Sequence, residues 1–62
     1  MNVLEYVQKC IQEAGYDRAE ILFTHGTWTV KVFHGKEEIV SSQDILPASA
    51  CYQVCNKIRQ KN

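Results

Sequence analysis

The sequence predicts a single α+β domain spanning residues 1–62, in which a helix, three antiparallel strands and a second helix follow one another. Residues 20–42 alternate between apolar and polar side chains and contain two glycine corners, a pattern typical of a β-meander. Apolar residues recur at helical spacing on both flanks of that stretch. Because both helical stripes and one sheet face need covering, we expect two layers, with a three-stranded antiparallel sheet and both helices packed on one face.

The first helix is predicted to begin after Asn2 and to end at Gly15. Asn2 is a favourable N-cap residue, and Glu5 follows it at the spacing of a capping box. Gly15 suits the left-handed conformation that often ends a helix. The buried stripe of this helix is predicted to contain Val3, Leu4, Val7, Cys10, Ile11 and Ala14.

The first hairpin is predicted to turn at His25-Gly26. Glycine adopts a positive φ freely and histidine does so more easily than most residues, as primed hairpin turns require. Pairing then sets Phe23 opposite Trp28 and Glu20 opposite Lys31, and we expect Trp28 near the middle of the core. Since side chains alternate across a strand, the helix-facing side is predicted to carry Ile21, Phe23, Trp28, Val30 and Val32.

Two turn positions fit the second corner, and the sequence leaves both open. A turn at His34-Gly35 pairs Val30 with Ile39, whereas a turn at Gly35-Lys36 pairs Val32 with Ile39. Either turn keeps Ile39 on the helix-facing side of the sheet.

The second helix is predicted over residues 47–59, because Pro47 suits a first helical turn. A polar break at residues 41–44 precedes it, and we expect the apolar pair Ile45-Leu46 to pack under the edge of the sheet. The buried stripe of this helix is predicted to contain Ala48, Cys51, Val54, Cys55 and Ile58.

The sheet face that points away from the helices is predicted to carry apolar as well as charged side chains. Scattered apolar residues are ordinary on protein surfaces, and that interpretation stays open. The alternative is a surface for a protein partner or for a second copy of the chain. The residues predicted to form this protein-binding surface are Leu22, Lys31, Phe33 and Val40.

The cysteines and histidines do not form a pattern that favours catalysis or metal binding. Cys10, Cys51 and Cys55 fall at core positions, and an odd number of thiols is typical of a reducing, cytoplasmic setting. His25 and His34 fall at hairpin corners, with no carboxylate placed to orient either. We therefore expect no enzyme activity, no catalytic residue, no metal, no cofactor and no small-molecule substrate.

The charge balance weighs against a strongly nucleic-acid-binding protein. Seven Lys and Arg residues offset seven Asp and Glu residues, and no apolar run approaches the roughly 20 residues that cross a bilayer. A local basic patch still fits within a neutral total. For that alternative, the residues predicted to contact nucleic acid are His25, Lys31, Lys36, Lys57 and Arg59.

The order of elements resembles the double-stranded-RNA-binding-domain topology, and within it the small HicA toxins, which are mRNA interferases. The similar motifs are Gly15-Tyr16, Gly26-Thr27, Gly35-Lys36 and Asp44-Ile45-Leu46-Pro47. The resemblance implies this topology and an RNA-directed activity. The catalytic histidine of that family would fall within residues 26–29, where this chain has none. The resemblance therefore supports the topology more than the activity.

From these patterns we expect a small, non-enzymatic, cytoplasmic binding or regulatory module that acts by protein–protein contact through the open sheet face or a sheet edge. Chains of this size and composition are common among prophage and accessory-element proteins that modulate a host partner. The alternative is an RNA-binding protein or a relative of the HicA mRNA interferases.

Overall fold

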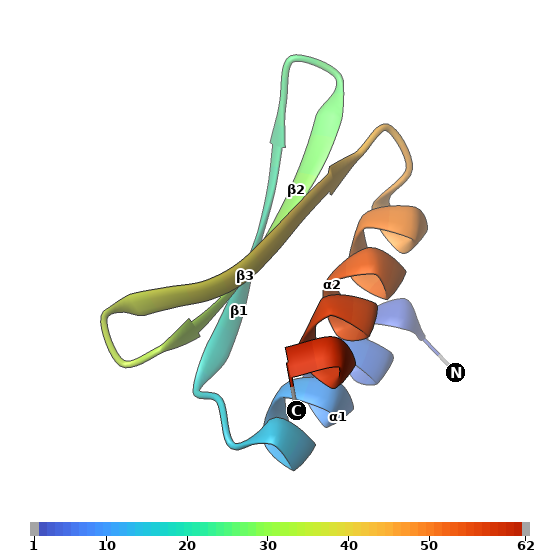
Figure 1. Cartoon of the computed structure of the whole chain (residues 1–62). Coiled ribbons are helices and arrows are strands. Elements are labelled where there is room, and N and C mark those ends of the chain that lie inside the picture. The colour runs from blue at the N-terminus through green and yellow to red at the C-terminus, as the bar shows by residue number, and fades with distance from the viewer. Residues whose placement is uncertain (1, 62) are drawn as a thin grey trace.

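A computed structural model describes residues 2–61 and shows helix α1 (Val3–Ala14), strands β1 (Arg18–Thr24), β2 (Thr27–His34) and β3 (Glu37–Asp44), and helix α2 (Pro47–Lys61). The strands form one antiparallel sheet in the order β1-β2-β3. Both helices lie on the same side of this sheet (Figure 1). The predicted α+β order and the two-layer arrangement are confirmed. No helix of residues 2–61 is both long and apolar enough to span a membrane.

Helix α1 begins and ends where its capping residues predict. The Asn2 Oδ1 atom accepts a hydrogen bond from the Leu4 N–H at 2.8 Å, and Gly15 adopts φ 82° at the other end. Val7, Cys10 and Ile11 are buried. The prediction was wrong for Leu4, which is exposed, whereas Tyr6 packs against the core and contacts the Tyr52 ring of α2.

The first hairpin has the predicted register. Phe23 lies opposite Trp28 and Glu20 lies opposite Lys31, around a two-residue turn in which His25 has φ 52° and Gly26 has φ 75°. Positive φ at both central residues is the requirement of a type I′ turn. Turn chemistry and apolar alternation agree in this hairpin, and together they fix which residues face the helices.

The second hairpin contains a β-bulge that the sequence prediction missed. Its turn is Gly35-Lys36, with Phe33 opposite Glu38, but Val32 then lies opposite Val40 rather than Ile39. Ile39 is the extra residue and has no partner in the register. Both predicted pairings of Ile39 were therefore wrong. Beyond the bulge the faces of β3 are exchanged, so Val40 packs against the core and not on the open face.

The core lies between the sheet and the two helices. Val30 and Val32 from the middle strand meet α1 and α2 residues, including the buried thiols of Cys51 and Cys55. Trp28 is on the predicted face, but it is half-buried and packs at the border of the core rather than at its middle. The centre of the core is therefore aliphatic and thiol-rich.

The segment from the end of β3 through α2 differs from the prediction in four respects. Residues 41–44 continue β3 instead of forming a break, and the helix extends to Lys61. Ala48 is exposed, while Ala50 takes the buried position. Ile45-Leu46 does not pack under the sheet edge, because this connection lies at the end of the molecule where the β1–β2 hairpin extends past the helix (Figure 1).

Candidate protein-binding surface

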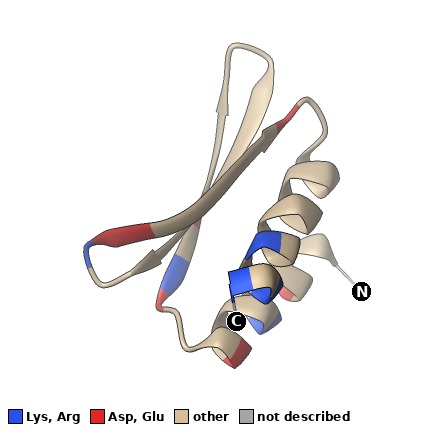
Figure 2. Ribbon diagram, viewed as in Figure 1, with Lys and Arg blue, Asp and Glu red and all other residues tan. Residues whose placement is uncertain are grey.

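One end of the molecule has almost no charge. Residues 21–30, which form the tip of the β1–β2 hairpin, and residues 45–56, which start α2, contain no Asp, Glu, Lys or Arg. The register brings these two segments together, since Trp28 lies opposite Asp44, directly before the start of the second segment. Figure 2 shows the charged positions gathered toward the other end of the sheet and helices.

This same end exposes the largest apolar side chains of the sheet and of the connection into α2. Ile45 is 73% exposed, Leu46 60% and Phe23 58%, and Trp28 is half-buried beside them. On the other face of the sheet Leu22 is 45% exposed. We call these five residues the apolar end. Protein interfaces are depleted of charge and enriched in aromatic residues at their centres, and the apolar end has both properties.

Two aromatic rings of the apolar end contact each other across the hairpin. The ring centroids of Phe23 and Trp28 lie 4.8 Å apart and the rings are tilted by 46°. Such a tilted pair is favourable. The exposed Phe23 ring therefore packs against the half-buried indole.

Asp44 lies beside the apolar end, opposite Trp28, and is engaged within the chain. Its carboxylate accepts hydrogen bonds from the Leu46 N–H at 3.1 Å, the Ser49 hydroxyl at 2.9 Å and the Gln53 side-chain amide at 2.8 Å. The Leu46 N–H, followed by the Ser49 hydroxyl, holds the pKa of Asp44 below its ordinary value. Asp44 thus fixes the connection that presents Ile45 and Leu46.

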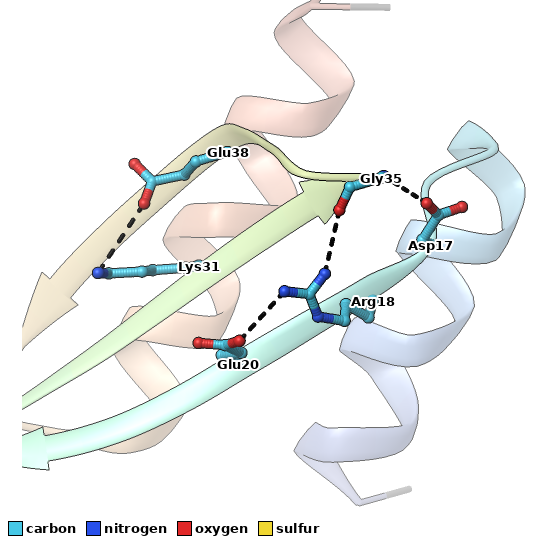
Figure 3. A network of polar contacts seen from close by, with 6 residues as sticks. All are labelled: Asp17, Arg18, Glu20, Lys31, Gly35 and Glu38. Atoms are coloured by element: carbon cyan, nitrogen blue, oxygen red, sulfur yellow. Dashed lines mark hydrogen bonds and ion pairs between the residues drawn. The ribbon is translucent and has the colours of Figure 1, made fainter.

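The residues predicted for the open face are not brought together as one apolar surface. Phe33 is half-buried, with the Arg18 guanidinium 4.3 Å from its ring centroid. Lys31 forms an ion pair with Glu38 at 3.9 Å (Figure 3). Val40 lies on the helix-facing side, which corrects its predicted placement. Of the four predicted residues, Leu22 alone belongs to the apolar end.

Arg18 and Asp17 form hydrogen bonds with Gly35 in the second turn, beside Phe33. The Arg18 guanidinium donates to the Gly35 carbonyl at 3.2 Å and to Glu20 Oε2 at 3.3 Å, and the Gly35 N–H donates to the Asp17 carboxylate (Figure 3). Glu20 therefore pairs with Arg18 along its own strand, although Lys31 lies opposite it. The open face near Phe33 is closed by polar contacts within the chain.

The residues predicted for nucleic-acid contact are spread over the molecule. His25 is in the β1–β2 turn and Lys36 is in the β2–β3 turn, at opposite ends of β2, while Lys31 is on the open face. On the helical side, Lys57 Nζ donates to the Ser41 carbonyl at 2.6 Å, and the Arg59 guanidinium lies 5.3 Å from the Tyr6 ring centroid. These five residues do not form one basic surface.

The three thiols lie between the helices, as predicted for core residues. Cys51 and Cys55 are fully buried, and Cys10 reaches a small groove of about 260 Å³ that is lined by Cys10, Glu13, Ala14, Ile58 and Arg59. This volume is below the usual range of ligand pockets. Within residues 2–61 no three His, Cys, Asp or Glu side chains are grouped to hold a metal ion.

Four residues of the apolar end, Phe23, Trp28, Ile45 and Leu46, were not predicted as a site. A signal for them was present in the sequence, because two long segments that flank the turn and the helix start lack charge. Comparison of the chain with protein-family models, with curated proteins and with solved structures found no match in any of the three. The resemblance to HicA toxins accordingly stays a sequence-based expectation.

Proposed function

We propose that this chain is a small, non-enzymatic protein-binding module of the cytoplasm, and that it contacts an uncharged, apolar partner surface through the apolar end. The observation that carries the proposal is the exposure of Phe23, Ile45 and Leu46 beside Trp28 at an end without free charge. Exposed apolar side chains gathered at one place on a surface often mark an interaction site. The three unpaired cysteines support a reducing compartment.

The chemistry of the apolar end favours a protein partner over a nucleic acid. Burying uncharged apolar surface yields free energy without the cost of desolvating ions. A phosphate backbone, in contrast, needs a group of free cations, and the nearest Lys and Arg side chains are engaged elsewhere or lie at the far end of the sheet. In the proposed contact, Phe23 and Trp28 act as the anchors, since rigid aromatic groups dominate most interface energies.

The test is a comparison of two matched aspartate substitutions. Phe23→Asp places a charge in the apolar end, whereas Phe33→Asp places the same charge on the open face beside Arg18, which can pair with it. The affinity-tagged chain is expressed in its native cells, and co-purifying proteins are quantified by mass spectrometry. We expect Phe23→Asp and Ile45→Asp to abolish recovery of the partner and Phe33→Asp to retain it.

Circular dichroism of each purified variant verifies that the fold is intact. Loss of the partner with Phe33→Asp, together with its retention by Phe23→Asp and Ile45→Asp, would assign the contact to the open face and overturn the proposal.

A further inference from the structure

The outer edge of β1 is open for strand pairing. β1 is a terminal strand of the sheet, and the residues flanking the first turn form a hydrogen-bonded pair in a two-residue hairpin. Because such pairs alternate along the strand, the backbone groups of Ala19, Ile21 and Phe23 point outward. Among residues 2–61, no hydrogen bond outside the sheet ladder reaches those groups.

The two edges of the sheet differ in their protection. β3 carries Glu37 and Glu38, is bulged at Ile39, and has the Ser41 carbonyl occupied by the Lys57 ammonium. Charges, bulges and covering groups are the usual devices that prevent a sheet edge from pairing. The outer half of β1, residues 21–24, has no charge, no proline and no bulge. β1 is therefore the edge on which a further strand can be added.

We propose that a second copy of the chain pairs with this edge, β1 against β1 in antiparallel orientation, to form a continuous six-stranded sheet. This inference rests on the proposed function, because Leu22 and Phe23 of β1 belong to the apolar end, and it names a second copy of the chain as the partner of that strand. The formal net charge of zero means that two copies approach without long-range repulsion.

Pairing centred on Ile21 fits the charges of the strand. It joins all residues of β1, with Arg18 opposite Thr24 of the second copy and Glu20 opposite Leu22 of the second copy. No like charges then face one another. A shift that centres the pairing on Glu20 would set two carboxylates opposite each other, which is unfavourable. The charge pattern thus disfavours the Glu20-centred register, and of the registers that remain, the one centred on Ile21 pairs the full length of β1.

A dimer interface of standard size would cover a modest share of the surface of each chain. The chain exposes 4186 Å², and a standard interface takes about 800 Å² from each partner, or about a fifth of that total. The flanking side chains of the paired strands, Leu22 on the open face and Phe23 on the helix-facing side, add apolar contact to the backbone hydrogen bonds.

The experiment is sedimentation velocity of the purified chain over the widest concentration range that its solubility allows. We expect a reversible monomer–dimer equilibrium. Leu22→Glu places a carboxylate opposite Glu20 of the second copy, whereas Leu22→Lys places an ammonium there. The dimer dissociation constants of these two matched variants are expected to differ by about tenfold or more, with Leu22→Glu the weaker.

A wild-type chain that stays monomeric at every concentration would overturn the dimer, and equal dissociation constants for Leu22→Glu and Leu22→Lys would overturn pairing centred on Ile21. Neither result affects the recovery of a different protein through Phe23 and Ile45, so the two proposals fail separately.

Discussion

The rings of Phe23 and Trp28 lie against each other across the first hairpin, 4.8 Å apart, with the indole half-buried and the phenyl ring exposed. This relationship predicts unequal stability losses. Trp28→Ala removes core contacts and should cost about 2 kcal/mol, less than a fully buried tryptophan. Phe23→Ala loses mainly the ring pair and should cost about 1 kcal/mol. Urea unfolding measures both, and equal losses of several kcal/mol would place Phe23 in the core.

Ser42 provides a test of the bulge. Beyond Ile39, the Ser42 side chain faces the helices, where it is buried and its hydroxyl has no hydrogen-bond partner. Ser42→Ala removes an unsatisfied hydroxyl and should raise the free energy of unfolding by about 1 kcal/mol. Ser41→Ala on the opposite face is the control and should change it by less than about 0.5 kcal/mol. A destabilised Ser42→Ala protein would indicate that the hydroxyl is satisfied.

Asp44 predicts an acid-dependent part of the stability. The Leu46 N–H and the Ser49 and Gln53 side chains hold its folded-state pKa below the ordinary value of 3.8. Since the folded pKa is depressed, the contribution is present above that ordinary value and is lost as the pH falls through the folded pKa. Asp44→Ala should lower Tm at neutral pH, and its difference from wild type should shrink in acid.

The control for this prediction is Asp44→Asn, which keeps an oxygen acceptor without the charge and should have an intermediate Tm. A difference between wild type and Asp44→Ala that stays constant from neutral pH into acid would show that the ionised carboxylate contributes nothing to stability.

The buried thiols predict that the stability of the fold falls as the pH rises into the basic range, opposite to the effect of Asp44 in acid. Burial, together with a hydrogen bond to Cys10, raises the pKa of Cys55 from 9.0 to about 12, and burial also raises that of Cys51. The stability that these raised pKa values contribute is fully present below pH 9.0, and it is lost as the pH rises toward the folded-state pKa. The free energy of unfolding of wild type, measured in urea, should fall as the pH rises across this range. That of Cys55→Ala should fall less steeply. Identical slopes would contradict the burial of the Cys55 thiol.

The parts of the fold that depend on local chemistry could be predicted from the sequence. The His25-Gly26 turn, the alternation around it and the Asn2 and Gly15 caps each contain their own signal. The helical stripes predicted the thiol-rich core for the same reason, because helical spacing alone places Cys51 and Cys55 on one face. Local rules thus predicted the order of the elements and the two-layer arrangement.

The parts that depend on how the elements meet could not be predicted. The bulge at Ile39 brings Val40 under the helices, and that gain is visible only when the two layers are packed together. Likewise, the exposure of Ile45 and Leu46 depends on how far the first hairpin extends past α2 (Figure 1). Val40 was predicted on the wrong face, because one extra residue exchanged the faces of β3.

Site-specific photocrosslinking tests the central claim, contact through the apolar end, most directly. A benzophenone side chain replaces Phe23 in one variant and Phe33 in another, and both are irradiated in the cells that produce the chain. We expect a covalent adduct, whether with a second copy or with another protein, from position 23 and none from position 33. An adduct from position 33 alone would contradict it.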